Sequence, residues 1–309
     1  MSVTAYLTQS GLTAKVRARY GRRLSEGELA TVAGLGSTAE VTTFLQEREP
    51  WTRELSASDG AGLRRAMDKA MKAEFHSLGH FVAAGDKIFW QFYSHQQDLR
   101  RLLAEYPRFR MADELYSAAA GTIYEGSVKR NVQGGQLPGF AAMDALLRSR
   151  YDAYLLRLIA NQYKGKTGQQ LKRLLGEATD RVNLLSLLRL KTYFPVQAQT
   201  LARYLPAHHR LNQRLYAQLS AAKTVAELRS LLAAEPHFAP LAQLPLAELE
   251  QEQIRSLRRL YRQVIHGGEV SVAVAFVYLS DRAYALSEVC AAWETVAERE
   301  ARKKEATTW

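Results

Sequence analysis

An eleven-residue phrase occurs twice in this chain, at residues 99–109 and 228–238, and it constrains the fold more than any other feature. Both copies place leucines at helical spacing ahead of a proline and an aromatic residue, a pattern typical of a helix that ends at the proline. A looser third copy, at 41–51, has one additional residue before its proline. A helical unit reused at distant places favours a scaffold over an enzyme built around one site.

The helices that carry these phrases also begin alike. Ser37 and Thr224 each precede a glutamate by three residues, in the Ser/Thr-x-x-Glu pattern of a capping box. In that motif the hydroxyl accepts a hydrogen bond from the backbone amide three residues later. The glutamate carboxylate accepts one from the backbone amide of the cap residue. The sequence therefore predicts a short helix, a turn and a second capped helix over 24–45 and again over 211–232, each an αα-hairpin.

Helical periodicity continues along most of the chain, which predicts an all-α fold class. Residues 140–162 and 167–193 each place their apolar side chains on one face, and 246–266 shows the same pattern. The β-branched run that begins at Val270 continues into apolar residues at helical spacing, so we expect a buried helix there. The charged segment 298–305 is expected to fray.

Composition bounds the class of protein. With 309 residues, 47% hydrophobic and 24% charged, the chain can bury a large core. Its single cysteine, Cys290, provides no disulfide framework and favours a reducing, cytoplasmic compartment. The first residues lack the basic and then apolar pattern of a signal peptide. The longest apolar run, 270–279, is about half of what a membrane crossing needs, so a soluble chain is expected.

A net charge of +11 raises the question of nucleic-acid binding. The basic residues form separate clusters, without an RNP-like aromatic motif, a zinc knuckle or a long basic tail. A solvated or partner-facing basic surface is therefore favoured over specific nucleic-acid binding. The three clusters are Arg17, Arg19, Arg22 and Arg23; Arg100, Arg101, Arg108 and Arg110; and Arg299, Arg302, Lys303 and Lys304.

A basic stripe is also predicted on the helix over 246–266. Arg255, Arg258, Arg259 and Arg262 recur at spacings that place them beside the apolar face, while glutamates occupy the start of the helix. This order complements the helix dipole. The stripe suits an acidic partner, and a solvated face is the simpler interpretation.

Signals of catalytic chemistry are weak, and we predict no catalytic residue, cofactor site or metal site. Residues 165–167 resemble the end of a phosphate-binding loop, but Ala160 stands where that motif needs glycine. Residues 34–39 fit a loose dinucleotide fingerprint, yet a helix stop followed by a cap explains them better. His76 and His80 lie one helical turn apart without an evident third ligand, so partly buried structural histidines are expected.

One helix carries a family resemblance. Residues 180–191 contain Asp180, Asn183, Arg189 and Lys191 in an Asp-x-x-Asn-Leu…Arg-x-Lys phrase. This phrase resembles the signature helix of the V-type (A/V-type) ATPase subunit that is called C in prokaryotic complexes and d in eukaryotic ones.

Two other stretches extend the resemblance. Tyr204-Leu205-Pro206 and the capped helix that follows are similar to that family's proline turn and hairpin, and 14–45 resembles its opening. The sequence departs from the family at His209, where the family has glycine, and at 282–285, where two acidic residues are replaced.

The resemblance implies an all-helical, funnel-shaped protein of three similar lobes, approximately 1–111, 112–206 and 207–309. It implies a non-catalytic rotor subunit that links the central stalk to the membrane proteolipid ring. Such a subunit transmits torque for ATP-coupled proton or sodium transport. Its partners would be the stalk subunits and the ring, with indirect membrane contact on the cytoplasmic, inner face. The four signature residues would be structural.

Two other functions remain open at this level. The first is a basic helical-repeat protein that binds nucleic acid or an acidic protein partner. The second is an enzyme that uses the region of His76 and His80, which would require a bound metal.

Overall fold

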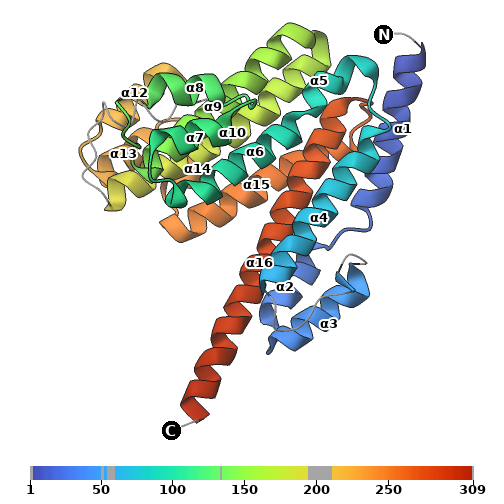
Figure 1. Ribbon diagram of the computed structural model, residues 1–309, viewed down its shortest axis with the longest axis vertical. Helices are drawn as coiled ribbons and strands as arrows, with labels where there is room; N and C mark the ends of the chain where they lie inside the picture. Colours follow the sequence, from blue (N-terminus) through green and yellow to red (C-terminus); the bar gives the residue numbers. More distant parts are fainter. Residues whose placement is uncertain (1–2, 50–51, 54–59, 133, 194–210, 308–309) are drawn as a thin grey trace. The chain divides into compact units, whose positions relative to one another are not determined.

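The computed structural model describes residues 3–49, 52–53, 60–132, 134–193 and 211–307 (Figure 1). Helices are the only regular elements in these ranges, so the predicted all-α fold class is confirmed. Several sequence features lie outside the described residues: Pro50-Trp51, Tyr204-Leu205-Pro206 and His208-His209.

The chain divides into two compact units and passes between them twice, once after Asp86 and once within helix α15 (Leu246–His266). Unit 1 comprises Met1–Asp86 and Tyr261–Trp309, and unit 2 comprises Lys87–Leu260. The three predicted lobes, with limits near 111 and 206, are a different division and remain a prediction.

Unit 1 is organised around its longest helix, α16, which packs against four others, α1 to α4. The first eight residues of α16, 272–279, are all buried. The predicted helix over the β-branched run is therefore confirmed. The elements of unit 1 are α1 (Val3–Tyr20), α2 (Glu26–Gly34), α3 (Thr38–Arg48), α4 (Gly60–Gly79), the 3₁₀ turn η2 (Ala84–Asp86), the end of α15 (Leu246–His266) and α16 (Val272–Thr307).

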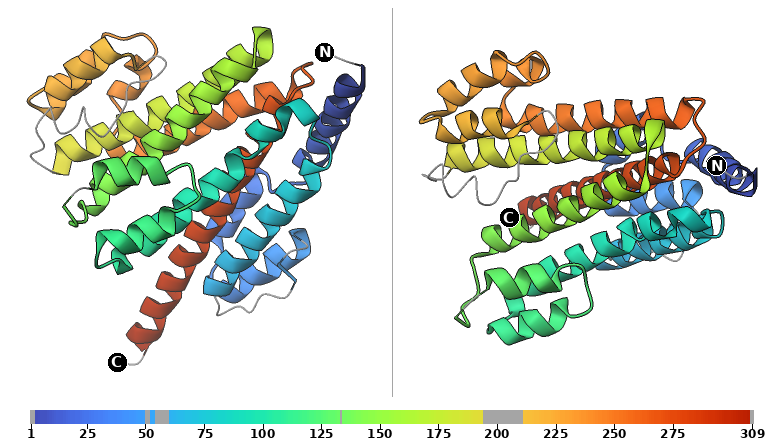
Figure 2. Two further views of the ribbon diagram at one scale, coloured as in Figure 1. Left: turned by 45° about the horizontal axis from the view of Figure 1, so that its top comes forward. Right: turned by 90° about the horizontal axis from the view of Figure 1, so that it is seen from above.

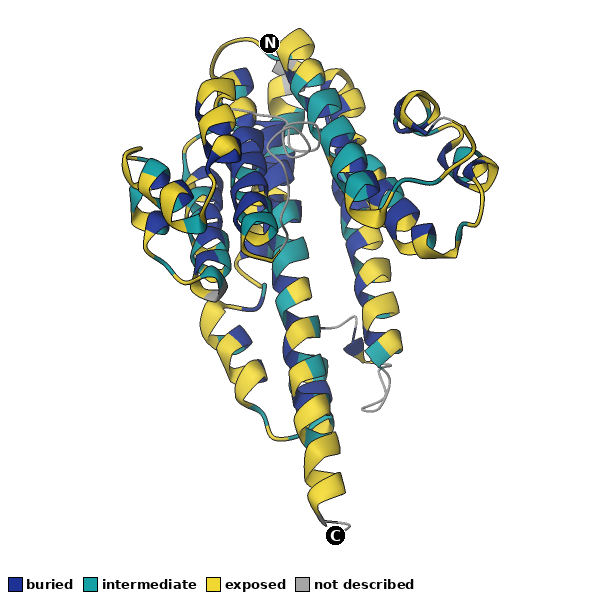
Figure 3. Cartoon of the chain, turned by 90° about the vertical axis from the view of Figure 1, so that its left-hand side faces the viewer, coloured by how far each residue is buried: buried dark blue, intermediate teal, exposed yellow. Residues whose placement is uncertain are grey.

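The fraying expected at 298–305 is wrong, because α16 continues as a helix to Thr307. Figure 3 shows this end as an exposed stretch of helix. Two neighbouring side chains tie it to the rest of unit 1. The Glu300 carboxylate accepts the Thr38 amide (3.0 Å) at the start of α3, and Arg299 donates to the Ala33 carbonyl oxygen (2.7 Å) in α2.

Buried ion pairs also hold α16 in place. Both Nη atoms of Arg282 contact the carboxylate of Glu49, at 2.6 and 2.7 Å, and Glu49 is only 4% exposed. Arg23 Nε lies 3.0 Å from Oδ2 of Asp281, which is fully buried. A charge that is buried away from water is costly unless an opposite charge pairs with it, so these contacts hold α16 in one position against its neighbours.

Unit 2 contains three long helices packed in succession, with α9 between α6 and α10 (Figure 2). The 29 residues of α10 give a length of about 44 Å at 1.5 Å per residue. Its elements are α5 (Lys87–Trp90), α6 (Phe92–Glu105), the 3₁₀ turn η3 (Tyr106–Arg108), α7 (Ala112–Ala119), α8 (Glu125–Asn131), α9 (Phe140–Gln162), α10 (Gly165–Tyr193), α12 (Gln213–Ala221), α13 (Val225–Ala233), α14 (Ala239–Ala242) and α15 to Leu260.

Candidate functional site

The predicted hairpin repeat is confirmed residue for residue. Helices α12 and α13 begin 187 positions after α2 and α3, respectively. The two phrases at 99–109 and 228–238 do end helices, α6 and α13. Equivalent positions of the two hairpins are buried, which shows that both use the same apolar face. The buried pairs are Leu24 and Leu211, Leu29 and Tyr216, Val32 and Leu219, Val41 and Leu228, and Leu45 and Leu232.

A third hairpin, α7–α8, was not found from the sequence. Its buried positions fall 100 residues before those of α12–α13. The sequence signal is faint because small and β-branched residues replace the leucines. The equivalent buried pairs are Leu115 and Leu215, Ala119 and Leu219, Val128 and Leu228, and Val132 and Leu232.

The predicted caps are half right. The Ser37 hydroxyl accepts the Glu40 amide (3.2 Å), as expected. The Glu40 carboxylate, however, accepts the amide of Gly36 (2.8 Å), one residue before the cap. Helix α13 repeats both bonds, at Thr224 and Lys223. The reciprocal bond to the cap amide was therefore predicted wrongly, and the glutamate instead fixes the turn that joins the two helices of each hairpin.

In each hairpin, a basic side chain from a longer neighbouring helix also donates to a carbonyl oxygen at the end of the hairpin's first helix. Carbonyl groups there lack intrahelical partners and carry the negative end of the helix dipole, so a cation is favourable. Arg299 of α16 donates to the carbonyl oxygen of Ala33 (2.7 Å), and Arg101 of α6 donates to that of Ala118 (2.9 Å). Lys191 of α10 donates to the carbonyl oxygen of Ser220 (2.8 Å).

Two signature residues on α10 hold the two ends of helix α12. Oδ2 of Asp180, which is 1% exposed, accepts the Leu211 amide (3.0 Å) just before α12. Lys191 donates to the carbonyl oxygens of Ser220 and Ala222 (2.6 Å) at its other end. Asp180 thus accepts a hydrogen bond from the segment that leads into α12. Asn183, one turn from Asp180, is also buried.

The same helix is joined to α15 by arginines. Nη2 of Arg189, a half-exposed side chain, lies 2.5 Å from Oε2 of Glu250. Sequence reasoning missed Arg181, which donates to the Gln253 carbonyl oxygen (3.1 Å) and to the Ser256 hydroxyl (3.0 Å). Helix α10 therefore carries the contacts that position both α12 and α15 within unit 2.

The basic stripe on α15 differs from the expectation at one position. Arg255 and Arg259 have largely exposed side chains, and both contact Glu252, at 3.8 and 2.5 Å. Arg258 is only 3% exposed, so its predicted place on a solvent-facing stripe is wrong. It lies three residues before the buried Tyr261, on the apolar face of the helix.

The remaining member of the stripe, Arg262, belongs to unit 1. Its Nη2 lies 3.0 Å from Oε1 of Glu26 at the start of α2, and both side chains are substantially exposed. This pair is therefore a surface contact of modest energy.

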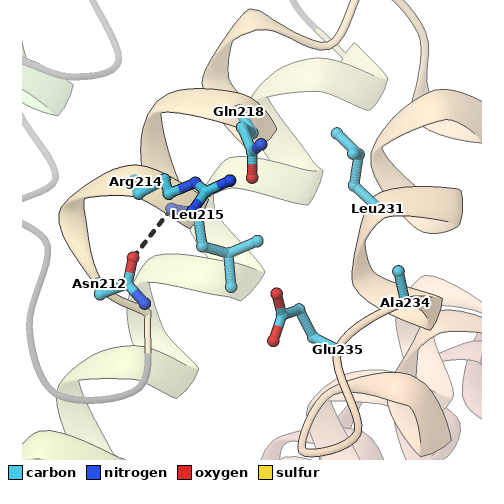
Figure 4. Close-up of a pocket in the computed structure, with 7 residues that line it drawn as sticks. All are labelled: Asn212, Arg214, Leu215, Gln218, Leu231, Ala234 and Glu235. Atoms are coloured by element: carbon cyan, nitrogen blue, oxygen red, sulfur yellow. Dashed lines mark hydrogen bonds between the residues drawn. The ribbon is translucent and has the colours of Figure 1, made fainter.

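A depression of about 410 Å³ opens between α12 and the end of α13 (Figure 4). Asn212 caps α12 at its edge by accepting the Leu215 amide (3.0 Å). Figure 4 shows Arg214 and Gln218 on one side and Glu235 on the other, around the apolar Leu215 and Leu231. The lining therefore mixes charged, polar and apolar side chains.

The histidines were predicted wrongly, because both His76 and His80 are exposed at the end of α4. In the parts of the chain that the structure describes, no group of His, Cys, Asp or Glu side chains has the arrangement of a metal site. Residues 34–39 are confirmed as a helix stop followed by a cap, since Gly34 ends α2 and Ser37 caps α3. Gly165 begins α10, with two residues between it and the end of α9.

Across the described ranges, no helix combines the length and apolar character needed to span a bilayer. The fold and its contacts thus define a class of all-helical protein built on repeated hairpins held by long helices.

Residues 109–297 match the model of the family described as ATP synthase (C/AC39) subunit. The match covers more than half of the chain and includes α10 with the last two hairpins, so the chain belongs to this family of V-type (A/V-type) ATPase subunits. A search among curated proteins finds no match.

Proposed function

We propose that this chain is the non-catalytic rotor subunit that links the central stalk of the ATPase to the membrane proteolipid ring. It transmits torque for ATP-coupled proton or sodium transport. The observation that carries the proposal is the family match over 109–297, which contains the signature residues from Asp180 to Lys191. The chain itself then lies on the cytoplasmic, inner face of the membrane and meets the membrane only through the ring.

Long, firmly seated helices support a mechanical role. A part that transmits torque must resist bending and twisting more than it must enclose a pocket. Helices α10 and α16, of 29 and 36 residues, are held by side chains at several points along their length. The buried pair of Arg282 and Glu49 is one such contact in unit 1, and Asp180 with Leu211 is another in unit 2.

The three hairpins support a threefold construction. We assign one hairpin to each lobe: α2–α3 to 1–111, α12–α13 to 207–309, and α7–α8 to 112–206. In this proposal the lobes form the funnel that receives the tip of the stalk. The signature residues Asp180, Asn183, Arg189 and Lys191 serve structure in this proposal, since the described contacts of Asp180, Arg189 and Lys191 lie within the chain and Asn183 is buried.

The exposed arginines of α15 supply a testable contact. We assign Arg255 and Arg259 to a surface that faces acidic groups of the stalk or ring, where a partner carboxylate replaces Glu252. The double reversal Arg255→Glu/Arg259→Glu should lower co-purification of the chain with stalk subunits. A matched reversal of two other exposed arginines, Arg157→Glu/Arg173→Glu, should leave it unchanged. Equal effects of both reversals would contradict this assignment.

The central test is purification of a tagged chain from cells that make the complete ATPase. Stalk and ring subunits should be recovered with it in fixed ratio, from the membrane fraction. Recovery of nucleic acid, or a salt-dependent gel shift with plain duplex DNA or RNA at physiological ionic strength, would instead support the alternative of a basic nucleic-acid-binding repeat protein.

A further inference from the structure

An aromatic cluster supports a small surface at the junction of α6, η3 and the start of α9, all within unit 2. The buried Tyr106 ring has its centroid 6.2 Å from that of Phe109 and 6.1 Å from that of Phe140. Its hydroxyl donates to the Pro138 carbonyl oxygen. We call residues 108–111 with Phe140 the η3 surface.

The η3 surface exposes large apolar side chains. Met111 is 58% exposed and Phe140 is 51% exposed, although both are residues that normally seek burial. The Tyr106 ring contacts Phe140 at the start of α9 and also Phe109, which precedes Met111 by two residues. Contiguous exposed apolar side chains mark contact sites.

The backbone of this surface is fixed before any partner binds. The carboxylate of Glu114 accepts the amide of Arg110 (2.6 Å) and that of Met111 (3.3 Å). These bonds hold the turn into α7, so the side chains of 110 and 111 project from an ordered segment. A contact surface that is already ordered loses little conformational entropy on binding.

Two arginines flank the apolar side chains. Arg108 and Arg110 are exposed, and within the described ranges no carboxylate lies within 4.0 Å of either guanidinium. The nearby Arg101 differs, because it contacts Glu105 at 3.5 Å and Asp98 at 3.9 Å. The η3 surface thus offers two guanidinium groups that can receive carboxylates without breaking an ion pair in the described chain.

We propose that the η3 surface binds an acidic, amphipathic segment of another protein subunit of the ATPase. Apolar side chains of that segment rest on Met111 and Phe140, and its carboxylates bind Arg108 and Arg110. The proposal rests on the function proposed above, and it adds one specific surface and the chemistry of its partner.

The composition favours a protein partner over a lipid surface. Arginine, methionine and aromatic residues are enriched in the cores of protein interfaces, whereas lysine is depleted there. Recognition of anionic lipids relies on clusters of about four to eight basic residues. The η3 surface has two arginines and no lysine.

The test places a photoreactive p-benzoylphenylalanine at position 111 of the full chain in the assembled ATPase. Ultraviolet irradiation and mass spectrometry then identify what is cross-linked. The expected product joins residue 111 to a peptide of another subunit with net negative charge. In the same background, Arg108→Glu/Arg110→Glu should reduce this product roughly tenfold, since each close charge pair contributes appreciably to binding.

The matched control is Arg157→Glu/Arg173→Glu, which changes two exposed arginines and the net charge by the same amount and should leave the product unchanged. Phe140→Ala should reduce the product without altering charge. A product with lipid, a product with a neutral or basic peptide, or no product from a chain that is still in the complex would overturn the proposal. A chain that never enters the complex would overturn the proposed function as well.

Discussion

The ammonium group of Lys191 lies 2.8 Å from the carbonyl oxygen of Ser220, near the last turn of α12. The equivalent carbonyl of the first hairpin, 187 positions earlier, receives Arg299 instead. Two helices that are far apart in the sequence thus stabilise equivalent hairpin ends with a cation. The shared arrangement indicates that Lys191, near the end of α10, stabilises the end of α12.

Replacing Lys191 by methionine should therefore weaken unit 2. Lys191→Met keeps the length of the side chain but leaves two carbonyl oxygens without their charged donor. We expect the free energy of unfolding to fall by about 1–2 kcal/mol, measured by urea denaturation. Lys172→Met, at an exposed position of the same helix, should change it by less than about 0.5 kcal/mol. Equal stabilities of the two variants would contradict this role.

The buried pair of Arg282 and Glu49 predicts strong coupling between two substitutions. Arg282→Met leaves the carboxylate of Glu49 buried without this partner and should cost about 3 kcal/mol or more of unfolding free energy. Adding Glu49→Gln removes the buried charge and should restore a large part of that loss. A double-mutant cycle by chemical denaturation measures the coupling; additive losses would argue against a mutually dependent pair.

The first turn of α10 requires glycine at position 168, where it packs against the turn that follows α9. A Cβ atom there would overlap the carbonyl oxygen of Tyr163, which is backbone and cannot move aside easily. Gly168→Ala should lower the thermal midpoint, with a loss of about 1–3 kcal/mol in stability. At Gly139, no heavy atom lies within 4 Å of an added Cβ, so Gly139→Ala should be tolerated. A harmless Gly168→Ala would mean that this turn is not tightly packed.

Asp152 predicts a pH-dependent stability. Burial raises the pKa of Asp152 to about 7, although the hydroxyl of Thr179 donates a hydrogen bond to its carboxylate, which acts in the opposite direction. Between about pH 4 and 7 the folded chain keeps a proton at this group that the unfolded chain has released. This contribution to stability is therefore present at low pH and is lost as the pH rises through 7.

Asp152→Asn should remove that slope and make the chain more stable than wild type by about 1 kcal/mol at pH 8. Unfolding free energies from pH 5 to 8 measure the difference. Asp113→Asn, at an exposed position, should leave the slope unchanged. Parallel profiles for wild type and Asp152→Asn would contradict the prediction.

The sequence was sufficient where the structure is local and repeated. Hydrophobic spacing and the caps at Ser37 and Thr224 predicted two hairpins, and both occur. The middle hairpin was missed because Tyr124 stands at its second cap position and Ala119 replaces a leucine. Its helices are identified only by how they pack, which one sequence does not display.

Side-chain placement was harder to predict because it depends on neighbouring helices. The spacing of Arg258 fits a stripe, but the apolar face of α15 is wide enough to bury it. The pairing of Arg282 with Glu49, and of Lys191 with Ser220, joins positions far apart in the sequence. No local pattern marks such contacts.

The most direct test of the central claim removes the chain from a reconstituted ATPase and follows ATP hydrolysis and ion pumping together. We predict that the catalytic head still hydrolyses ATP, while ATP-driven ion transport is lost and the stalk no longer co-purifies with the ring. Adding the purified chain should restore both. Ion transport at the normal rate by a complex that lacks the chain would contradict a role in coupling stalk to ring.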